Sequence, residues 1–308
     1  MAYQLVRDEN VMQGIRRIVV EEYEAAGNWL GEEQAGTGNG VHEARKCFKR
    51  VRGALRLVRK ELGKQYGVEN EAVRDLAQQL ASVRDAQAML ETLAKLRELF
   101  GGYLQPDTFN GVQTALQSRM DSLVASDSTM PETIQSVRES LVAAQQRVEA
   151  WPDSKETFAT LQPGLERIYQ NGLLEFRRAH KSGDPFYYHE WRKNVKYLWY
   201  HVTLLENIWP KMMQAQKKAL KSLSDVLGDE HDLTVFQSFL PEISEDFKEG
   251  AEIQLLMGLA ERRQSQLRAM SVFLGERIYA EEPDAFTRRL RAYWRTWKHE
   301  GDTIADLI

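Results

Sequence analysis

Positive charge gathers in one short stretch of this sequence, residues 41–64, which read VHEARKCFKRVRGALRLVRKELGK. The stretch holds nine lysines and arginines against two glutamates, although the whole chain has a formal net charge of −4. Arginine offers planar forks that bind phosphate through two hydrogen bonds, lysine offers a mobile point charge, and histidine adds a donor that protonation strengthens. A surface that combines these three side chains suits a phosphate-bearing anion.

The spacing of these residues places them on one side of a helix. At 100° per residue, with the histidine at 0°, the basic side chains fall between about −80° and +40°. Apolar side chains fall on the opposite side, so we expect the helix to pack on a core and to present a cationic ridge. The ridge comprises His42, Arg45, Lys46, Lys49, Arg52 and Arg56, and the apolar side comprises Val41, Ala44, Phe48, Val51, Leu55, Val58 and Leu62.

A solvated helix face is the ordinary explanation of a run of charge. Such faces usually alternate basic with acidic residues, and this one hardly does, so its cations repel one another at i,i+3 and i,i+4 spacing. The pattern also returns 147 residues later, where HEWRKNVK lies over HEARKCFK with five matched residues. A basic face present in both copies indicates a shared task. The second ridge comprises His189, Arg192, Lys193 and Lys196, with Trp199 and Thr203 in the places of Arg52 and Arg56.

The correspondence extends beyond the ridges and predicts an internal repeat. We expect an all-α protein of two helical bundles, residues 1–150 and 151–308, related by a pseudo-twofold axis. Two ridges that face one another across such an axis would form a channel of positive potential for a long polyanion. Four cations at repeated positions are further candidates for that channel. The matched pairs are Leu76 with Leu223, Leu80 with Leu227, Asp85 with Asp232, Arg74 with Lys221 and, at an offset of 150, Arg17 with Arg167.

The rest of the chain agrees with helices and with a location in the cytoplasm. Apolar residues recur at three- and four-residue spacing, no hairpin signal occurs, and breaks near Gly67 and Pro241, among others, leave about ten helices. No apolar run approaches the roughly 20 residues of a membrane span, and the N-terminus lacks the apolar core of a secretion signal. The single cysteine, Cys47, excludes an intramolecular disulfide, and we expect it to pack in the core.

Four motifs together resemble the CHAD domain, the conserved histidine α-helical domain. They are VHEARKCFKRVRGALR, its echo YHEWRKNVKYL, VRDAQ and LGDEHDL, and the resemblance covers nearly the whole chain. It implies two four-helix bundles with internal pseudo-symmetry and a basic surface or channel that binds inorganic polyphosphate. It also implies that the residues of both ridges form the polyphosphate site, and it makes polyphosphate granules one candidate location.

Several other residues could do chemistry. Asp85 and Asp232 could hold a metal or act as a base, but a role in orienting an arginine of the ridge is favoured. His231 is expected to donate to phosphate. The remaining histidines lack metal-ligand spacing, so neither a metal nor a cofactor is expected. Helical angles put Trp191 and Trp209 on the core side. Trp199 and Tyr200 lie toward the basic face, where aromatic rings could stack on nucleic-acid bases. The basic stretch 288–298 could widen the channel or be a solvated helix.

The favoured function is a binding module for inorganic polyphosphate, without catalysis. The enzyme alternative, a phosphohydrolase, has little support, because the Glu-x-Glu-x-Lys pattern of CYTH triphosphatases and the phosphate-binding P-loop are both absent. The ridges also hold almost no acidic groups that could bind a divalent metal. An accessory or regulatory module of polyphosphate or triphosphate metabolism and a nucleic-acid-binding protein remain as alternatives. The oligomeric state stays open.

Overall fold

Helices make up almost all of the described chain. The computed structural model describes residues 3–31, 38–80, 82–126, 130–153, 157–244 and 250–304, and within these it leaves aside the side chains of residues 38, 82–86, 123–126, 242–244 and 300–304. The α-helices of these ranges are α1 (Val11–Trp29), α3 (Gly38–Leu57), α4 (Arg59–Leu62), α5 (Gln65–Gln79), α6 (Ser82–Phe100), α7 (Asn110–Ser126), α8 (Met130–Glu149), α9 (Gln162–Ser182), α10 (Pro185–Leu204), α11 (Pro210–Ser244), α12 (Gly250–Ile278) and α13 (Pro283–Ile304). Three short 3₁₀ turns join them: η1 (Gly101–Tyr103), η2 (Phe158–Thr160) and η3 (Glu206–Ile208).

Local sequence signals set the turn that leads into α10. Gly183 ends α9 with a φ of 70°, a left-handed conformation that glycine adopts without strain. Asp184 then caps α10, because its side chain accepts a hydrogen bond of 2.9 Å from the backbone N–H of Phe186. Pro185 occupies the first helical position, where its missing N–H costs nothing. This tight connection makes α9 and α10 neighbours, and it fixes where α10 begins.

Two hydrophobic cores hold the helices together. The larger core combines α1, α3, α5 and α8 with α9, α10, α13 and the first part of α11. The smaller core combines α6 and α7 with the second part of α11 and with α12. Each core therefore draws side chains from both sides of residue 150. The proposed division at that residue remains a prediction about the repeat, since neither core is confined to one half of the chain.

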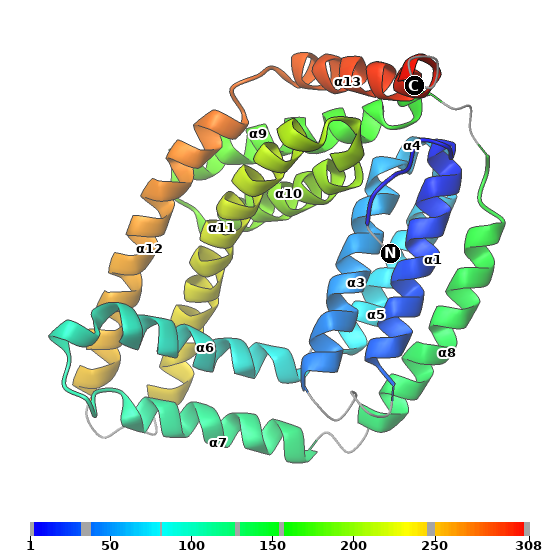
Figure 1. Cartoon of the computed structure of the whole chain (residues 1–308). Helices are drawn as coiled ribbons and strands as arrows, with labels where there is room; N and C mark the ends of the chain where they lie inside the picture. The colour runs from blue at the N-terminus through cyan, green and yellow to red at the C-terminus, as the bar shows by residue number, and fades with distance from the viewer. Residues whose placement is uncertain are drawn as a thin grey trace.

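Four helices form a ring around the middle of the molecule. Figure 1 shows α3, α10, α11 and α6 as its sides, with α1, α5, α8, α9, α12 and α13 packed outside. The backbones of α3 and α10 meet at Gly53, where a Cβ atom would lie 2.9 Å from the Cβ atom of Tyr200. A ring nitrogen of the buried His201, Nε2, lies 3.0 Å from the Gly53 carbonyl oxygen at the same crossing. Gly53 thus permits the close approach that brings the two ridges together.

Most predictions about the fold are confirmed. The described chain is helical without a strand, and the apolar side of α3 is buried from Ala44 to Leu62, with Val41 partly buried against the same core. Cys47 is also buried. The internal repeat stays a prediction. No helix in the described ranges is long and apolar enough to cross a membrane.

Three predictions differ from the structure. The break expected near Gly67 lies a few residues earlier, at Gly63 and Lys64 between α4 and α5, and Gly67 itself lies in the first turn of α5. Pro241 lies inside α11, near its end, where the packing of α11 and α12 around the smaller core continues. Trp209 is 46% exposed rather than buried, and it packs edge-on against Tyr293 with ring centres 4.7 Å apart.

Candidate cationic site on α3 and α10

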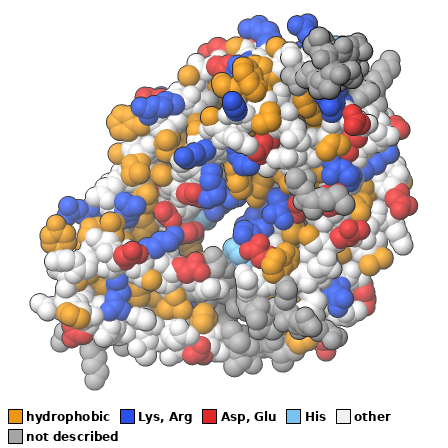
Figure 2. Space-filling view, in the orientation of Figure 1, with side chains coloured by type: hydrophobic (Ala, Val, Ile, Leu, Met, Phe, Trp, Pro, Cys, Tyr) orange, Lys and Arg blue, Asp and Glu red, His pale blue; other side chains and the backbone are white. Residues whose placement is uncertain are grey.

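A hollow opens in the middle of the ring. Figure 2 shows it as an opening on this face, with lysine and arginine side chains and histidines along its margin. The ridges of α3 and α10 supply cations to this region, because the two helices cross at Gly53 and diverge from there. The sequence-predicted ridges are therefore neighbours in the structure.

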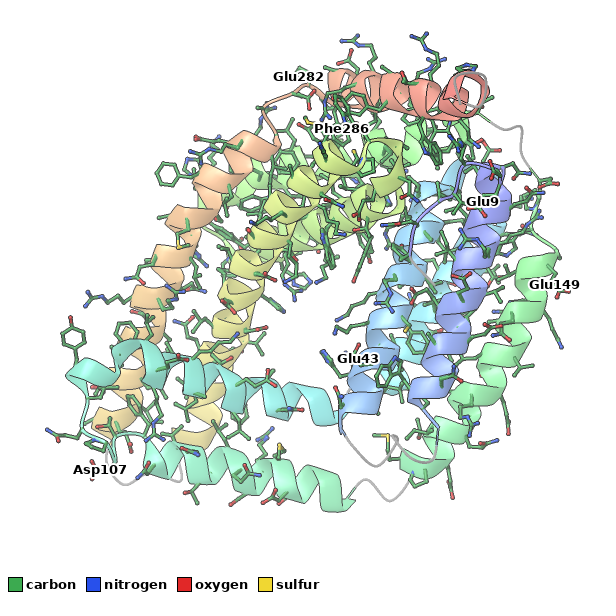
Figure 3. The ribbon with its side chains drawn as sticks, in the orientation of Figure 1. Glu9, Glu43, Asp107, Glu149, Glu282 and Phe286 are labelled. Carbon is green, nitrogen blue, oxygen red and sulfur yellow. The ribbon has the colours of Figure 1, made fainter. Side chains whose placement is uncertain are left out.

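The cations of α3 have mixed environments. Lys46 is exposed and forms an ion pair of 2.8 Å with Glu43, which Figure 3 shows on the part of α3 that borders the hollow. Arg45 donates from Nη1 to the Leu80 carbonyl oxygen over 2.7 Å, so it fastens α3 to the end of α5. Lys49 is exposed, and His42 is half-buried. Lys46 and Lys49 therefore offer the most accessible charge on this ridge.

Farther along α3, the ridge turns toward α5. Arg52 and Arg56 both donate to the Asn70 side-chain oxygen, over 3.2 and 2.9 Å. The Arg56 guanidinium also lies 3.9 Å from the centre of the Tyr197 ring, a contact that crosses from α3 to α10. An amide oxygen carries no charge, so Asn70 orients the two arginines without neutralising them.

The ridge of α10 holds cations that face one another across helices. Burial and the neighbouring charges of Arg192 and Lys221 lower the pKa of Lys196 from 10.5 to about 8. Lys46 from α3 adds to this effect, and the carboxylate of Asp225 opposes it. Burial is the largest cause of this shift, and three neighbouring cations add to it against one carboxylate. Three helices, α3, α10 and α11, therefore converge on one electropositive point.

Two histidines, His189 on α10 and His231 on α11, lie beside these cations. The rings of His189 and His231 lie 4.7 Å apart. Burial, with the charge of Arg192 and the nearby His189, lowers the pKa of His231 to about 4, and burial with Lys193 lowers the pKa of His189. His189 Nδ1 and Arg192 Nε are buried and have no hydrogen-bond partner in the described part of the chain. Buried polar atoms normally find a partner, so these two atoms are exceptions to the usual pattern.

The four cations predicted as further candidates for the channel divide into two groups. Lys221 lies close enough to lower the pKa of Lys196, although it pairs with Asp225 at 2.6 Å. Arg167 on α9 is exposed and lines a small cavity with residues of both ridges. The other two are neutralised by acidic partners: Arg17 by Glu9 and Glu21, at 2.7 and 3.2 Å, and Arg74 by Asp75, at 2.9 Å. Their described contacts do not bring them to the ridges.

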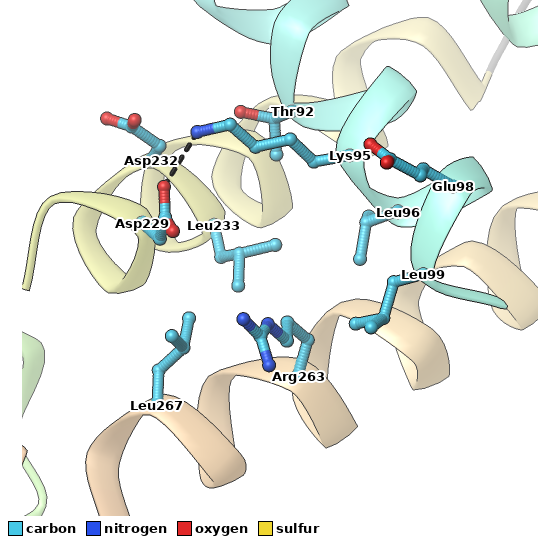
Figure 4. Close-up of a pocket in the computed structure, with 10 residues that line it drawn as sticks. All are labelled: Thr92, Lys95, Leu96, Glu98, Leu99, Asp229, Asp232, Leu233, Arg263 and Leu267. Atoms are coloured by element: carbon cyan, nitrogen blue, oxygen red, sulfur yellow. Dashed lines mark hydrogen bonds and ion pairs between the residues drawn. The ribbon is translucent and has the colours of Figure 1, made fainter. Parts of the chain in front are cut away.

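Of the two aspartates predicted to support the ridges, the structure describes the side chain of only one. Asp85 lies among the side chains that the structure does not describe. Asp232 lines a cavity of about 440 Å³ between α6, α11 and α12 (Figure 4). In the same cavity Lys95 pairs with Asp229 at 2.7 Å, and the charge of Asp232 helps to raise the pKa of Lys95. The role of Asp232 in orienting a ridge arginine stays a prediction.

Helix α13 carries the third basic stretch, 288–298. Its apolar side, including Phe286 and Trp294, is buried, and its main contacts are with α9, η2 and η3. Arg288 pairs with Asp284 at 2.7 Å, and Lys298 donates to backbone oxygens near the N-terminus. These contacts hold α13 on the outside of the ring (Figure 1), which agrees with a solvated helix rather than a widened channel.

Sequence reasoning missed several residues near the ridges. Arg59 follows Arg56 by three residues and continues its side of the chain into α4, a signal that was available from spacing alone. Tyr66, Asn70 and Tyr197 gave no such signal, because their roles depend on which helices meet. No group of three or more potential ligand residues that could hold a metal occurs among the described side chains. The arrangement as a whole can bind anions through charge and hydrogen bonds.

Both the sequence and the fold of this chain match a known family of proteins. A family model described as the CHAD domain matches residues 24–241, well over half of the chain. The crystal structure of the CHAD domain from the plant Ricinus communis is similar, with a TM-score of 0.69. Its sequence identity is 17%, over 91% of this chain and 95% of that chain, so the likeness concerns the fold. No curated protein matches this chain. The family match confirms the resemblance of the sequence motifs, and the chain belongs to the CHAD domain family.

Proposed function

We propose that this chain binds inorganic polyphosphate along the ridges of α3 and α10, as a binding module without catalysis. One observation carries the proposal: cations from three helices lie near the partly buried Lys196, and burial together with their charge lowers its pKa to about 8. Charge concentrated in this way repels itself in the free protein, and a polyanion relieves the repulsion. The exposed ammonium groups of Lys46 and Lys49 add donors that phosphate oxygens can reach.

The shape of the site favours a long anion over a small one. The ridges follow two helices of 20 residues each, which meet at Gly53. A polymer with one charge per phosphate unit can contact several cations along such a path, and each contact releases counterions. We also propose that the protein is cytoplasmic, and that it could bind to polyphosphate granules through the same contacts.

Salt dependence tests this proposal. We expect log affinity for long polyphosphate to fall linearly with log salt, and the slope to become shallower by about two in the double variant Lys46→Ala with Lys49→Ala. The control variant Lys181→Ala with Lys211→Ala removes two exposed cations outside the ridges and should leave the slope unchanged. Equal slopes in the two variants would contradict the assignment to the ridges.

Competition separates polyphosphate from nucleic acid. Donors placed for phosphate units that follow one another directly should prefer long polyphosphate to single-stranded DNA or RNA of equal total charge. Stronger binding to either nucleic acid at the same ionic strength would favour the alternative function. Incubation with polyphosphate and divalent metal, followed by measurement of released phosphate, tests the absence of hydrolysis.

A further inference from the structure

A small polar cavity lies beside the ridges, where α3, α4, α5, α9 and α10 meet. Its volume is about 210 Å³. Arginines and a lysine from four of these helices line it together with two tyrosines. The residues that carry the argument are Arg56, Arg59, Tyr66, Arg167, Lys193 and Tyr197.

The cavity has an excess of positive charge. In the described part of the chain, neither Arg56 nor Arg59 nor Arg167 forms an ion pair with a carboxylate. Glu190 is the acidic residue in the lining, and Lys193 pairs with it at 2.7 Å. Three arginines therefore remain without a charged partner. Burial, reinforced by the positive charge of Arg52 and Arg59, lowers the pKa of Arg56, and the neighbouring Tyr197 and Tyr66 offset this only in part.

The tyrosines fix two of the arginines in place. The Arg56 guanidinium lies over the Tyr197 ring at 3.9 Å, and the Arg59 guanidinium lies over the Tyr66 ring at 4.5 Å. A guanidinium that stacks on an aromatic face can still form hydrogen bonds along its edge. Arg56 Nη1 donates to Asn70 and to the Arg52 carbonyl oxygen, and the other N–H groups of its guanidinium can bond phosphate. Stacking also reduces the rotamer entropy that the arginines lose when an anion binds. The forks are therefore held ready for a ligand with several oxygens.

The dimensions of the cavity limit the ligand. Walls from five helices surround a space of about 210 Å³, whereas the ridges border an open hollow. A long polymer cannot enter such a space along its length, but a short anion with two or more charges can. Among the groups with several oxygens, phosphate suits the arginine forks because it accepts hydrogen bonds on every side.

We propose that this cavity is a separate site for a compact diphosphate group. The group has two sources with the same chemistry: free inorganic diphosphate, or the last two units of a longer phosphate chain. Arg59, Tyr66 and Arg167 lie outside both ridges, whereas Arg56 and Lys193 belong to them, so the cavity adjoins the ridges and extends beyond them. The stacked Arg56 and Arg59 and the exposed Arg167 contact the phosphate oxygens.

Calorimetry with inorganic diphosphate tests the site. We expect binding to the unmodified protein, and a loss of affinity of at least tenfold in the double variant Arg59→Ala with Arg167→Ala, because charged hydrogen bonds are removed. The variant Arg59→Lys with Arg167→Lys keeps the charge and loses the forks, so its affinity should lie between the two. Both residues are exposed, and circular dichroism with thermal unfolding verifies that the variants fold.

A matched variant separates this site from the ridges. Lys46→Ala with Lys49→Ala should bind inorganic diphosphate as the unmodified protein does, while its affinity for long polyphosphate falls. Absence of diphosphate binding to the unmodified protein, or equal affinity in the Arg59 and Arg167 variant, overturns the cavity site and leaves the proposed function intact. Loss of diphosphate binding in the ridge variant alone also overturns it, since the anion would then lie on the ridge.

Blocked chain ends distinguish the two sources. If the terminal units of a chain enter the cavity, long polyphosphate with both ends esterified should bind more weakly than the unblocked polymer, and the Arg59 and Arg167 variant should lose that difference. If free diphosphate is the ligand, blocked and unblocked polymers bind equally and inorganic diphosphate still binds.

Discussion

The titration of Lys196 offers the sharpest test of the convergence of α3, α10 and α11. Its pKa is lowered to about 8 by burial and by the charges of Arg192 and Lys221, with a contribution from Lys46. In the free protein it therefore loses its proton between pH 7 and 9. Phosphates bound at this point would restore the charged form and raise the pKa toward 10.5, the ordinary value. Binding must then take up protons, and affinity must fall as pH rises.

The size of the effect follows from the two pKa values. With a pKa of about 8 free and 10.5 bound, affinity for long polyphosphate should fall about tenfold between pH 7 and pH 9. Proton uptake on binding should rise from about a tenth of a proton at pH 7 to about nine tenths at pH 9. The histidines do not add to this change, because the pKa values of His189, His201 and His231 are all lowered from 6.5 and these groups are neutral above pH 7.

Calorimetry at constant ionic strength, in two buffers of different ionisation enthalpy, measures both quantities. The matched variant is Lys196→Arg, because a guanidinium keeps its proton throughout this range. Its affinity should change little between pH 7 and 9, and its proton uptake should stay near zero. The same pH dependence in both proteins would show that another group titrates, and a flat profile in the unmodified protein would show that phosphates do not reach Lys196.

Two further predictions concern the crossing and the histidines. Gly53→Ala should destabilise the protein by about 1–3 kcal/mol in urea unfolding, because the new methyl group would meet Tyr200. The control variant Gly67→Ala should be neutral or stabilising, because no atom lies within 4 Å of its Cβ position. Equal effects of the two substitutions would refute the close approach of α3 to α10. The affinity of the unmodified protein for polyphosphate should rise about twentyfold from pH 7 to pH 5 if binding restores the pKa of His231 from about 4 to 6.5. His189→Gln with His231→Gln should remove most of that rise, and an unchanged profile would mean that the histidines are structural.

The ridges were predictable because they depend on helical spacing alone. Once residues 41–64 form a helix, Lys46, Lys49 and Arg52 must share a side, whatever the rest of the chain does. The same holds for the second ridge, where Lys196 follows from the repeat of the motif. Burial of the apolar side of α3 followed from the same spacing, because a helix with one apolar face packs on a core.

The contacts between helices were not predictable in this way. The wrong prediction for Trp209 shows the limit, since its angle was counted along α10 although that helix ends at Leu204 and η3 interrupts the register. Gly53 gave no signal as a crossing point, because a glycine inside a helix is also tolerated for other reasons. The stacking of Arg56 on Tyr197 depends on that crossing. Spacing predicts which side chains share a face, but not which faces meet.

The positions of the ridge cations depend on the contacts that join the helices of the ring. Repulsion among Lys46, Lys196 and Lys221 would be relieved if α3, α10 and α11 moved apart, so something must hold the ring closed. At one corner the close approach of Gly53 to Tyr200 joins α3 to α10. At the opposite corner the smaller core, with the ion pair between Lys95 and Asp229, joins α6 to α11.

Both corners combine residues from the two halves of the chain, and the contact of Gly53 with Tyr200 is made by a glycine and a buried ring rather than by the ridge cations themselves. Apolar burial at these corners offsets the repulsion that the ridges create, because the hydrophobic contribution grows with the area removed from water and does not depend on charge. The cations can therefore stay close together with few carboxylates between them. An anion that binds there gains electrostatic energy from a site that is already assembled, and it need not draw the helices together. A solvated helix face would not require such closure, and for this reason the ring supports a binding function for the ridges more strongly than the charge run does by itself.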